Sequence, residues 1–265
     1  MASKLNWFRE RRATKRRLKE IREDPKNTFL IHYSCESFYD TPLGRTARVT
    51  CIAVRNLHSA QTRSFSIHKV AEQKYMANAD IPQHYDRLEQ LMLKEFYEFV
   101  QSNSGRTFVH WNMRDHNYGF AALEHRLKVL GGKPVVISES QKFDLARAMV
   151  SVYGRSYMQH GSMGRFLGIC ALNQITDRDA LAGAGEAQAF VNGDYLKLQL
   201  STLRKIDMMA NVFERAEDGT LTTEAKWKDN FSWHPQVLVE LIREHWAWSL
   251  FVILTAVVGF AARFF

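Results

Sequence analysis

The hydrophobic residues of the first 216 positions follow two spacings, and each spacing predicts one kind of element. Three short stretches rich in β-branched and aromatic residues, each bounded by loop-forming residues, lie at 28–38, 48–56 and 62–68. They predict three strands that pair antiparallel at the start of a domain. In residues 80–100 and 193–216, apolar residues instead recur every three or four positions, which predicts two long amphipathic helices.

Shorter elements are expected between these two helices. Two strands are predicted at 107–111 and 135–137, and three helices at 117–129, 143–153 and 164–172. Gly183 and Gly185 interrupt the pattern and indicate a loop or hinge. The last helix is expected to turn Leu196 and Leu200 toward the core. The order of elements predicts an α/β domain over residues 28–218, with a mixed sheet that is antiparallel at first and then parallel through helical crossovers.

The positive charge of the chain is concentrated at its start. The formal net charge is +8, and residues 1–27 carry ten Lys or Arg against four Asp or Glu. Helix-forming residues without Gly or Pro at 4–24 predict a basic helix, which makes residues 1–27 an N-terminal unit of their own. Such a helix suits an anionic membrane face. An ordinary solvated helix and a nucleic-acid-binding arm are open alternatives.

The end of the chain has the opposite character. Residues 246–262 contain no charged side chain, and a helix of that length can span or nearly span a bilayer. Trp246 and Trp248 stand where interfacial aromatic residues are expected, with Phe251 and Leu254 inside the span. The pattern therefore predicts a single transmembrane helix near the C-terminus, and a helix buried in a globular core is the alternative.

This interpretation sets the remaining organisation. Residues 219–245 form a linker and juxtamembrane helix, and residues 246–265 form the membrane anchor. Because basic residues precede the span, the bulk of the chain is expected to be cytoplasmic. The three cysteines, Cys35, Cys51 and Cys170, show no pairing pattern, which suits a reducing compartment.

A few polar residues stand where chemistry is expected in such a domain. The first predicted strand carries the triplet Ser34-Cys35-Glu36, and Asp207 lies on the last helix, five residues after Thr202. The short strand at 107–111 is followed by a polar loop that contains Asn112, Asp115 and Asn117. With the element order, this layout resembles the ribonuclease-H-like fold of the 3′–5′ exonucleases that use a DEDD set of acidic residues.

The resemblance implies specific roles. In that family an Asp-x-Glu lies on the first strand, a second Asp follows a short strand and an Asn, and a third motif places an acid on a late helix. Here Glu36 and Asp207 match two of the family's acids. Ser34 and Asn117 stand where the family has its other two acids, and Asp115 lies near Asn117 in the sequence. Thr202, or Ser201 beside it, stands where the family has a general base.

These departures decide what the resemblance predicts. The family cleaves phosphodiesters with two Mg²⁺ or Mn²⁺ ions, which need anionic oxygen ligands. Replacing two acids removes two negative charges, so Glu36 and Asp207 would hold one ion at most unless Asp115 or Asp40 contributes. Polar side chains at these sites can still bind phosphate or ribose, and four are candidates: Ser34, Asn112, Asn117 and Thr202.

The sequence therefore predicts a membrane-anchored, exonuclease-like domain that binds nucleic acid or a nucleotide without cleaving it, as a sensor or adaptor. Two alternatives stay open. One is an active, Mg²⁺- or Mn²⁺-dependent 3′–5′ exonuclease with Glu36, Asp207 and Asp115 as its catalytic acids. The other is a homo-oligomeric membrane effector of a bacterial defence or toxicity system.

Overall fold

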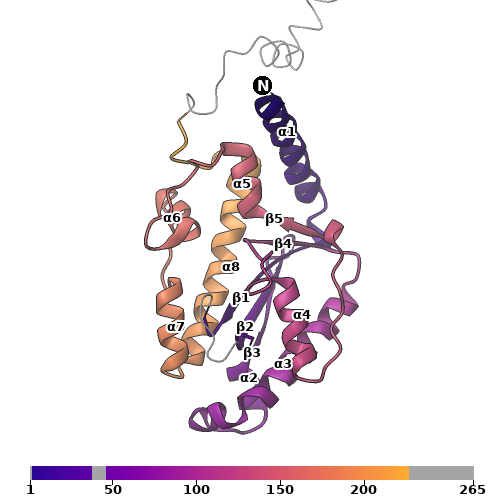
Figure 1. Cartoon of the computed structure of the whole chain (residues 1–265), viewed down its shortest axis with the longest axis vertical. Helices are drawn as coiled ribbons and strands as arrows, with labels where there is room; N and C mark the ends of the chain where they lie inside the picture. The colour runs from indigo at the N-terminus through magenta and orange to yellow at the C-terminus, as the bar shows by residue number, and fades with distance from the viewer. Residues whose placement is uncertain (1, 38–45, 227–265) are drawn as a thin grey trace, which may run out of the picture.

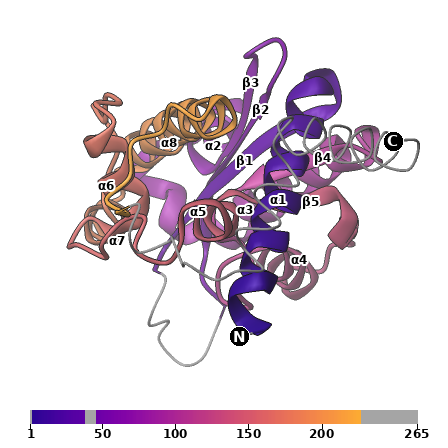
Figure 2. The ribbon, with the colours of Figure 1, turned by 90° about the horizontal axis from the view of Figure 1, so that it is seen from above.

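The computed structural model of the chain describes residues 2–37 and 46–226, and these form a five-stranded mixed sheet between two layers of helices (Figures 1 and 2). The strands are β1 (Thr28–Cys35), β2 (Val49–Asn56), β3 (Thr62–Ser66), β4 (Thr107–His110) and β5 (Lys142–Asp144). The α-helices are α1 (Ala2–Glu23), α2 (Ile67–Gln73), α3 (Ile81–Ser102), α4 (Phe120–Val129), α5 (Leu145–Tyr153), α6 (Gly164–Leu172), α7 (Gly183–Val191) and α8 (Tyr195–Asp218).

The sheet has the order β3-β2-β1-β4-β5. Neighbours pair antiparallel from β3 through β1, and β1, β4 and β5 run parallel. The prediction of an α/β fold with an antiparallel start and a parallel continuation is confirmed. This arrangement is consistent with a ribonuclease-H-like α/β fold.

The central strand β1 is buried on both faces because helices cover both sides of the sheet. Alternate side chains of a strand point to opposite faces, and Ile31 and Tyr33 belong to the core under α3 and α4. Leu30 belongs instead to the core under α1, α5 and α8. His32 and Ser34 therefore face the α8 side, whereas Cys35 faces the other, as the alternation predicts.

The long helix α8 covers β1 and β2, but its first turns are rotated relative to the prediction. Leu196 and Leu200 are 51% and 46% exposed, so their expected place in the core is wrong. Three polar side chains, Ser201, Thr202 and Lys205, are buried in their stead because they have partners beneath the helix. In these first turns Tyr195 and Leu198 face the core, and from Ile206 onward the buried side of α8 is almost entirely apolar.

The basic helix α1 packs onto the domain. Leu18 and Ile21 are buried in the core shared with α5 and α8. Arg11 donates a hydrogen bond from Nε to the carbonyl oxygen of Val152, at 3.0 Å. The domain thus covers the apolar stripe over the second half of α1, and most of the cationic residues of the helix stay exposed.

Several predicted boundaries need correction. Residues 135–137 are not a strand. Val136 there is 68% exposed, and a capping box at Ser138 starts the turn that leads into β5. The third strand ends at Ser66, because its hydroxyl caps α2 by accepting from the amide of Lys69. Gly183 and Gly185 form the first turn of α7 rather than a loop. The helix expected over residues 117–129 begins only at Phe120.

All three cysteines are free and buried, on β1, β2 and α6. The predicted juxtamembrane helix and membrane anchor lie outside the described residues, as do Trp246, Trp248, Phe251 and Leu254. Within residues 2–37 and 46–226, no helix combines the length and the apolar character needed to cross a bilayer.

Candidate ligand-binding site

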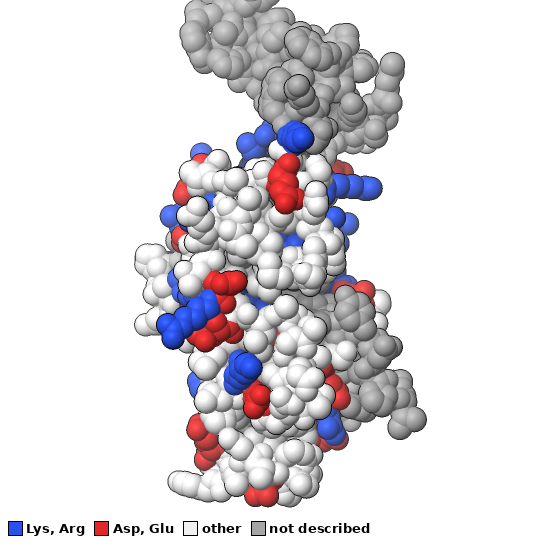
Figure 3. Space-filling model, turned by 90° about the vertical axis from the view of Figure 1, so that its left-hand side faces the viewer, with Lys and Arg blue, Asp and Glu red and all other residues white. Residues whose placement is uncertain are grey.

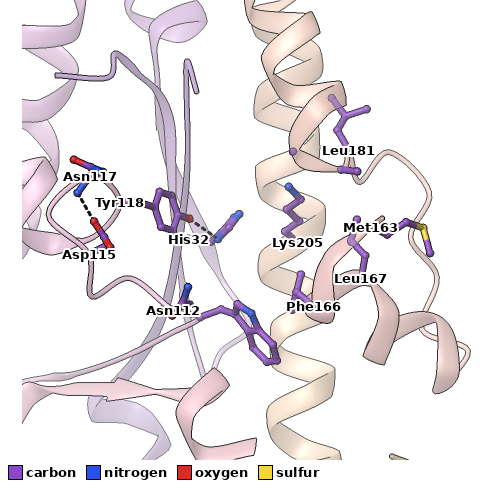
Figure 4. A pocket seen from close by; sticks show the side chains of 13 residues that line it. His32, Asn112, Asp115, Asn117, Tyr118, Met163, Phe166, Leu167, Leu181 and Lys205 are labelled. Atoms are coloured by element: carbon purple, nitrogen blue, oxygen red, sulfur yellow. Dashed lines mark hydrogen bonds between the residues drawn. The ribbon is translucent and has the colours of Figure 1, made fainter. Parts of the chain in front are cut away.

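An open cavity of about 470 Å³ lies at the carboxyl ends of the parallel strands β1 and β4 (Figure 4). Open α/β sheets bind ligands in the crevice at this edge, next to a change in strand direction. β1 supplies that change, since it is antiparallel to β2 and parallel to β4. The polar lining consists of His32, Asn112, Asp115, Asn117, Tyr118 and Lys205, and the apolar lining includes Trp111, Met163, Phe166, Leu167 and Leu181.

His32 presents an unprotonated nitrogen beside this cavity. The hydroxyl of Tyr118 donates to the carbonyl oxygen of Tyr33 at 3.0 Å and lies 3.3 Å from Nδ1 of His32. A phenol has one proton, so the Tyr118 oxygen accepts from His32 and the histidine proton sits on Nδ1. The other nitrogen, Nε2, is buried, has no hydrogen-bond partner among the described residues, and points toward α8 (Figure 4).

Burial keeps His32 neutral. It lowers the pKa of the imidazole to about 3, and the positive charge of Lys205 acts in the same direction. Around neutral pH the ring is therefore an acceptor at Nε2 and a donor at Nδ1. A ligand group with a hydrogen-bond donor would complement the free lone pair.

Lys205 supplies the cation of the cavity. Its Nζ lies 2.7 Å from Oε1 of Glu186, and both side chains are buried. The hydroxyl of Ser201 donates to the same carboxylate oxygen at 3.0 Å and accepts from the amide of Leu181. An ammonium has three hydrogens and Glu186 takes one, so the others are available toward the cavity that Lys205 lines.

The loop after β4 forms the opposite wall and is held in a fixed shape. Asn112 has a left-handed backbone (φ 55°), and its amide donates to Oδ1 of Asp144 at 3.1 Å. Arg114 forms an ion pair with Asp144 and donates to Oδ1 of Asn112. At Gly119 a Cβ atom would lie 2.7 Å from the backbone of Met113, so only glycine fits where the loop closes.

Three of the residues predicted from the resemblance meet in this cavity: Asn112, Asp115 and Asn117. Asp115 accepts from the amide of Asn117 at 2.8 Å, which shapes the loop tip. Ser34 and Thr202 also meet, with 3.1 Å between their hydroxyl oxygens. Both are completely buried, Ser34 lies 2.5 Å from the hydroxyl of Thr50, and neither lines the cavity.

The two retained acids, Glu36 and Asp207, are not brought together. Asp207 lies 2.5 Å from Arg55, which is paired in the sheet with Leu30. Glu36 follows β1 six residues after Leu30, and at about 3.3 Å per residue that is about 20 Å along the strand. The pairing of β1 with β2 shifts by one residue after Ser34, and Glu36, beyond the end of β1, lines a different hollow.

The metal arrangement that the resemblance implies does not fit the described residues. Two-metal sites need a cluster of carboxylates around both ions. Buried hydroxyls of Ser34 and Thr202 occupy the junction of β1 and α8, and among the described residues Asp115 is the one carboxylate that lines the cavity. Across the described part of the chain, no group of three or more His, Cys, Asp or Glu could hold a metal ion. Asp40 lies outside the described residues.

Comparisons with known proteins find no significant match to the chain, whether with models of protein families, with curated protein sequences or with solved structures. The site therefore has to be interpreted from its own chemistry.

Sequence reasoning missed the residues that define the cavity most strongly. The sequence assigns no role to His32, although strand alternation puts it on the same face as Ser34. Lys205 and Glu186 were not expected to pair, because the start of α7 was interpreted as a loop. One signal was present: Ser201, Thr202 and Lys205 recur at helical spacing within a stretch otherwise read as apolar.

Proposed function

We propose that the chain is a binding protein of ribonuclease-H-like architecture whose cavity at the ends of β1 and β4 holds a nucleotide without cleaving it. The nucleotide is either free or the terminal residue of a single strand. One observation carries the proposal: the buried hydroxyls of Ser34 and Thr202 stand where a nuclease of this fold would have an acid and a general base, and Lys205 supplies a cation to the neighbouring cavity.

The cavity lining suits the parts of a nucleotide. Trp111 and Phe166 lie in contact at its rim, with ring centroids 5.0 Å apart, and offer a face on which a base stacks. Asn112 and Asn117 supply amide groups, which can pair with base edges or sugar hydroxyls. Lys205 supplies ammonium hydrogens for phosphate oxygens. The volume of about 470 Å³ falls in the usual range for small-molecule sites.

Binding without cleavage agrees with the charge of the site. A phosphodiester is hydrolysed when its developing negative charge is stabilised, which metal ions do in the resembling family. Here the described donor set does not assemble a cage for such ions. The membrane anchor predicted at residues 246–265 belongs to the proposal, since it would hold the bound nucleotide at a membrane surface.

The test is a calorimetric titration of the full chain in a non-ionic detergent, with AMP and a six-nucleotide single-stranded DNA as probes. EDTA is present in one series and Mg²⁺ in another. Binding is expected in EDTA, and Trp111→Ala should weaken it about fivefold or more, since stacking contributes about 1–3 kcal/mol per base. Tyr75→Ala, at a fully exposed aromatic outside the cavity, is the matched control.

Two outcomes would contradict the proposal. If neither probe binds, or if Trp111→Ala and Tyr75→Ala behave alike, the cavity does not hold a nucleotide. If the DNA is shortened in Mg²⁺ but not in EDTA, the chain is an active metal-dependent nuclease, and the inference from Ser34 and Thr202 fails.

A further inference from the structure

A second hollow, of about 410 Å³, lies on the other side of the loop that walls the nucleotide cavity. Trp111 and Asn112 line the first cavity, and the next two residues, Met113 and Arg114, line the second. The two hollows are therefore one loop's thickness apart. The second hollow is completed by Thr14 on α1, Lys142 on β5, and Arg147 and Ser151 on α5.

This hollow carries surplus positive charge. Arg114 is paired with Asp144, and Lys142 lies 2.6 Å from Glu139, so these four side chains neutralise one another. Arg147 is exposed on α5, and its guanidinium has no ion-pair or hydrogen-bond partner among the described residues. The free charge of the hollow is therefore the guanidinium of Arg147.

Helix α1 extends this positive surface away from the hollow. It carries nine Lys or Arg against three Glu, and it touches the hollow through Thr14. Since Leu18 and Ile21 pack inward, the exposed side of α1 is the charged one. Lys15 is crowded there: partial burial and the neighbouring Arg11 both lower the pKa of its ammonium. A polyanion along this face would relieve that repulsion.

The face formed by α6 and α7 has a different distribution of charge. On the face formed by α6 and α7, acidic and basic side chains are interspersed among uncharged ones (Figure 3). A helix of 22 residues is about 33 Å long at 1.5 Å per residue. The exposed side of α1 thus offers an extended basic strip that passes the hollow at Thr14.

We propose that the basic hollow and the exposed side of α1 bind the phosphate backbone of a single-stranded nucleic acid whose terminal nucleotide occupies the cavity at the ends of β1 and β4. This inference rests on the proposed function and specifies its ligand: a strand of several nucleotides rather than a free nucleotide. The strand crosses the β4 loop between Asn112 and Arg114, passes Arg147, and continues along α1.

The experiment compares AMP with single-stranded DNA of three, six and twelve nucleotides, using the full chain in non-ionic detergent at several salt concentrations. Affinity is expected to rise with length, and Arg147→Gln should weaken binding of the twelve-nucleotide strand several-fold. The slope of log K against log salt should fall by about 0.7, the value for one phosphate contact on a single strand. AMP affinity should not change. Arg87→Gln, at an exposed arginine of α3, is the matched control.

The possible failures are distinguishable. If AMP binds but affinity does not rise with length, or Arg147→Gln and Arg87→Gln behave alike, the backbone path is wrong while the nucleotide cavity stands. If no nucleic acid binds but vesicles containing anionic lipid do, both proposals fail and the basic surface faces a membrane. If AMP and the longest strand lose equal affinity in Arg147→Gln, the hollow belongs to the nucleotide site and the path is again overturned.

Discussion

The neutral, buried His32 predicts a specific loss of stability in mild acid. Its pKa is lowered to about 3 in the folded chain by burial and by Lys205, whereas an unfolded chain has a histidine pKa of about 6.5. Protons therefore bind the unfolded state more tightly. The stabilisation is complete above about pH 6.5 and is lost progressively as the pH falls toward 3.

The magnitude follows from the two pKa values. At pH 5.0 an unfolded histidine is almost fully protonated and His32 is not, so linkage gives a loss of about 2 kcal/mol relative to pH 7.5. Since pH 5.0 lies well above the folded pKa, the figure depends mainly on the unfolded value. His110, whose pKa burial lowers to about 4 despite the nearby Asp144, contributes a similar and separate loss.

The assay is urea unfolding of the full chain in non-ionic detergent at pH 7.5 and 5.0, followed by tryptophan fluorescence. His32→Gln keeps an amide near Tyr118 but does not titrate, so its stability should fall by about 2 kcal/mol less than that of the wild type between the two pH values. His58→Gln, on the exposed turn after β2, controls for the loss of a histidine. Equal acid losses in His32→Gln and wild type would refute the reasoning.

Two further predictions concern packing. Lys205→Met should destabilise the chain by about 3–5 kcal/mol because it leaves the carboxylate of Glu186 buried without its cation. Adding Glu186→Gln to this variant should recover most of the loss. Thermal unfolding of the single and double variants measures this, and a double variant no more stable than Lys205→Met would contradict it. Leu18→Ala on α1 should cost about 2–5 kcal/mol, whereas Leu196→Ala on the exposed side of α8 should cost less than about 0.5 kcal/mol. Similar urea midpoints for these two variants would show that α1 does not share the core.

The parts of the fold that could be predicted are those with a strong local pattern. β1 and β2 are nearly continuous runs of strand-forming residues, and α3 repeats its apolar residues over 22 positions. Alternation correctly placed His32 and Ser34 on one face. The strand predicted at residues 135–137 was wrong because a run of three apolar residues is too short to show a strand period. The capping box at Ser138 sets the local structure instead.

The site was harder to predict because long-range partners set it. The helical spacing of Leu196 and Leu200 predicts that they face the core. In the structure Ser201, Thr202 and Lys205 face inward instead, because they have buried partners on α7 and β1. Helical spacing alone does not show which side of a helix has such partners. The prediction that Glu36 and Asp207 share a metal site does not fit the structure for a related reason.

In that case two distant features intervened. Glu36, beyond the end of β1, lines a different hollow, and Arg55 on β2 forms an ion pair with Asp207. Neither feature has a signature in the sequence around the acids themselves. The resemblance assigned Ser34 and Thr202 to one site, and β1 and α8 do bring their hydroxyls together.

The three buried thiols give the chain internal reporters of local opening. Burial raises the pKa of Cys35, Cys51 and Cys170 to about 12 each, so the reactive thiolate is scarce in the closed structure and reagents cannot reach it. Each thiol can be alkylated only when its own segment opens. Cys35 and Cys51 lie on paired strands at the centre of the sheet, whereas Cys170 lies on a peripheral helix. The rates at which the three thiols are labelled would therefore order the opening of sheet and periphery without any engineered probe.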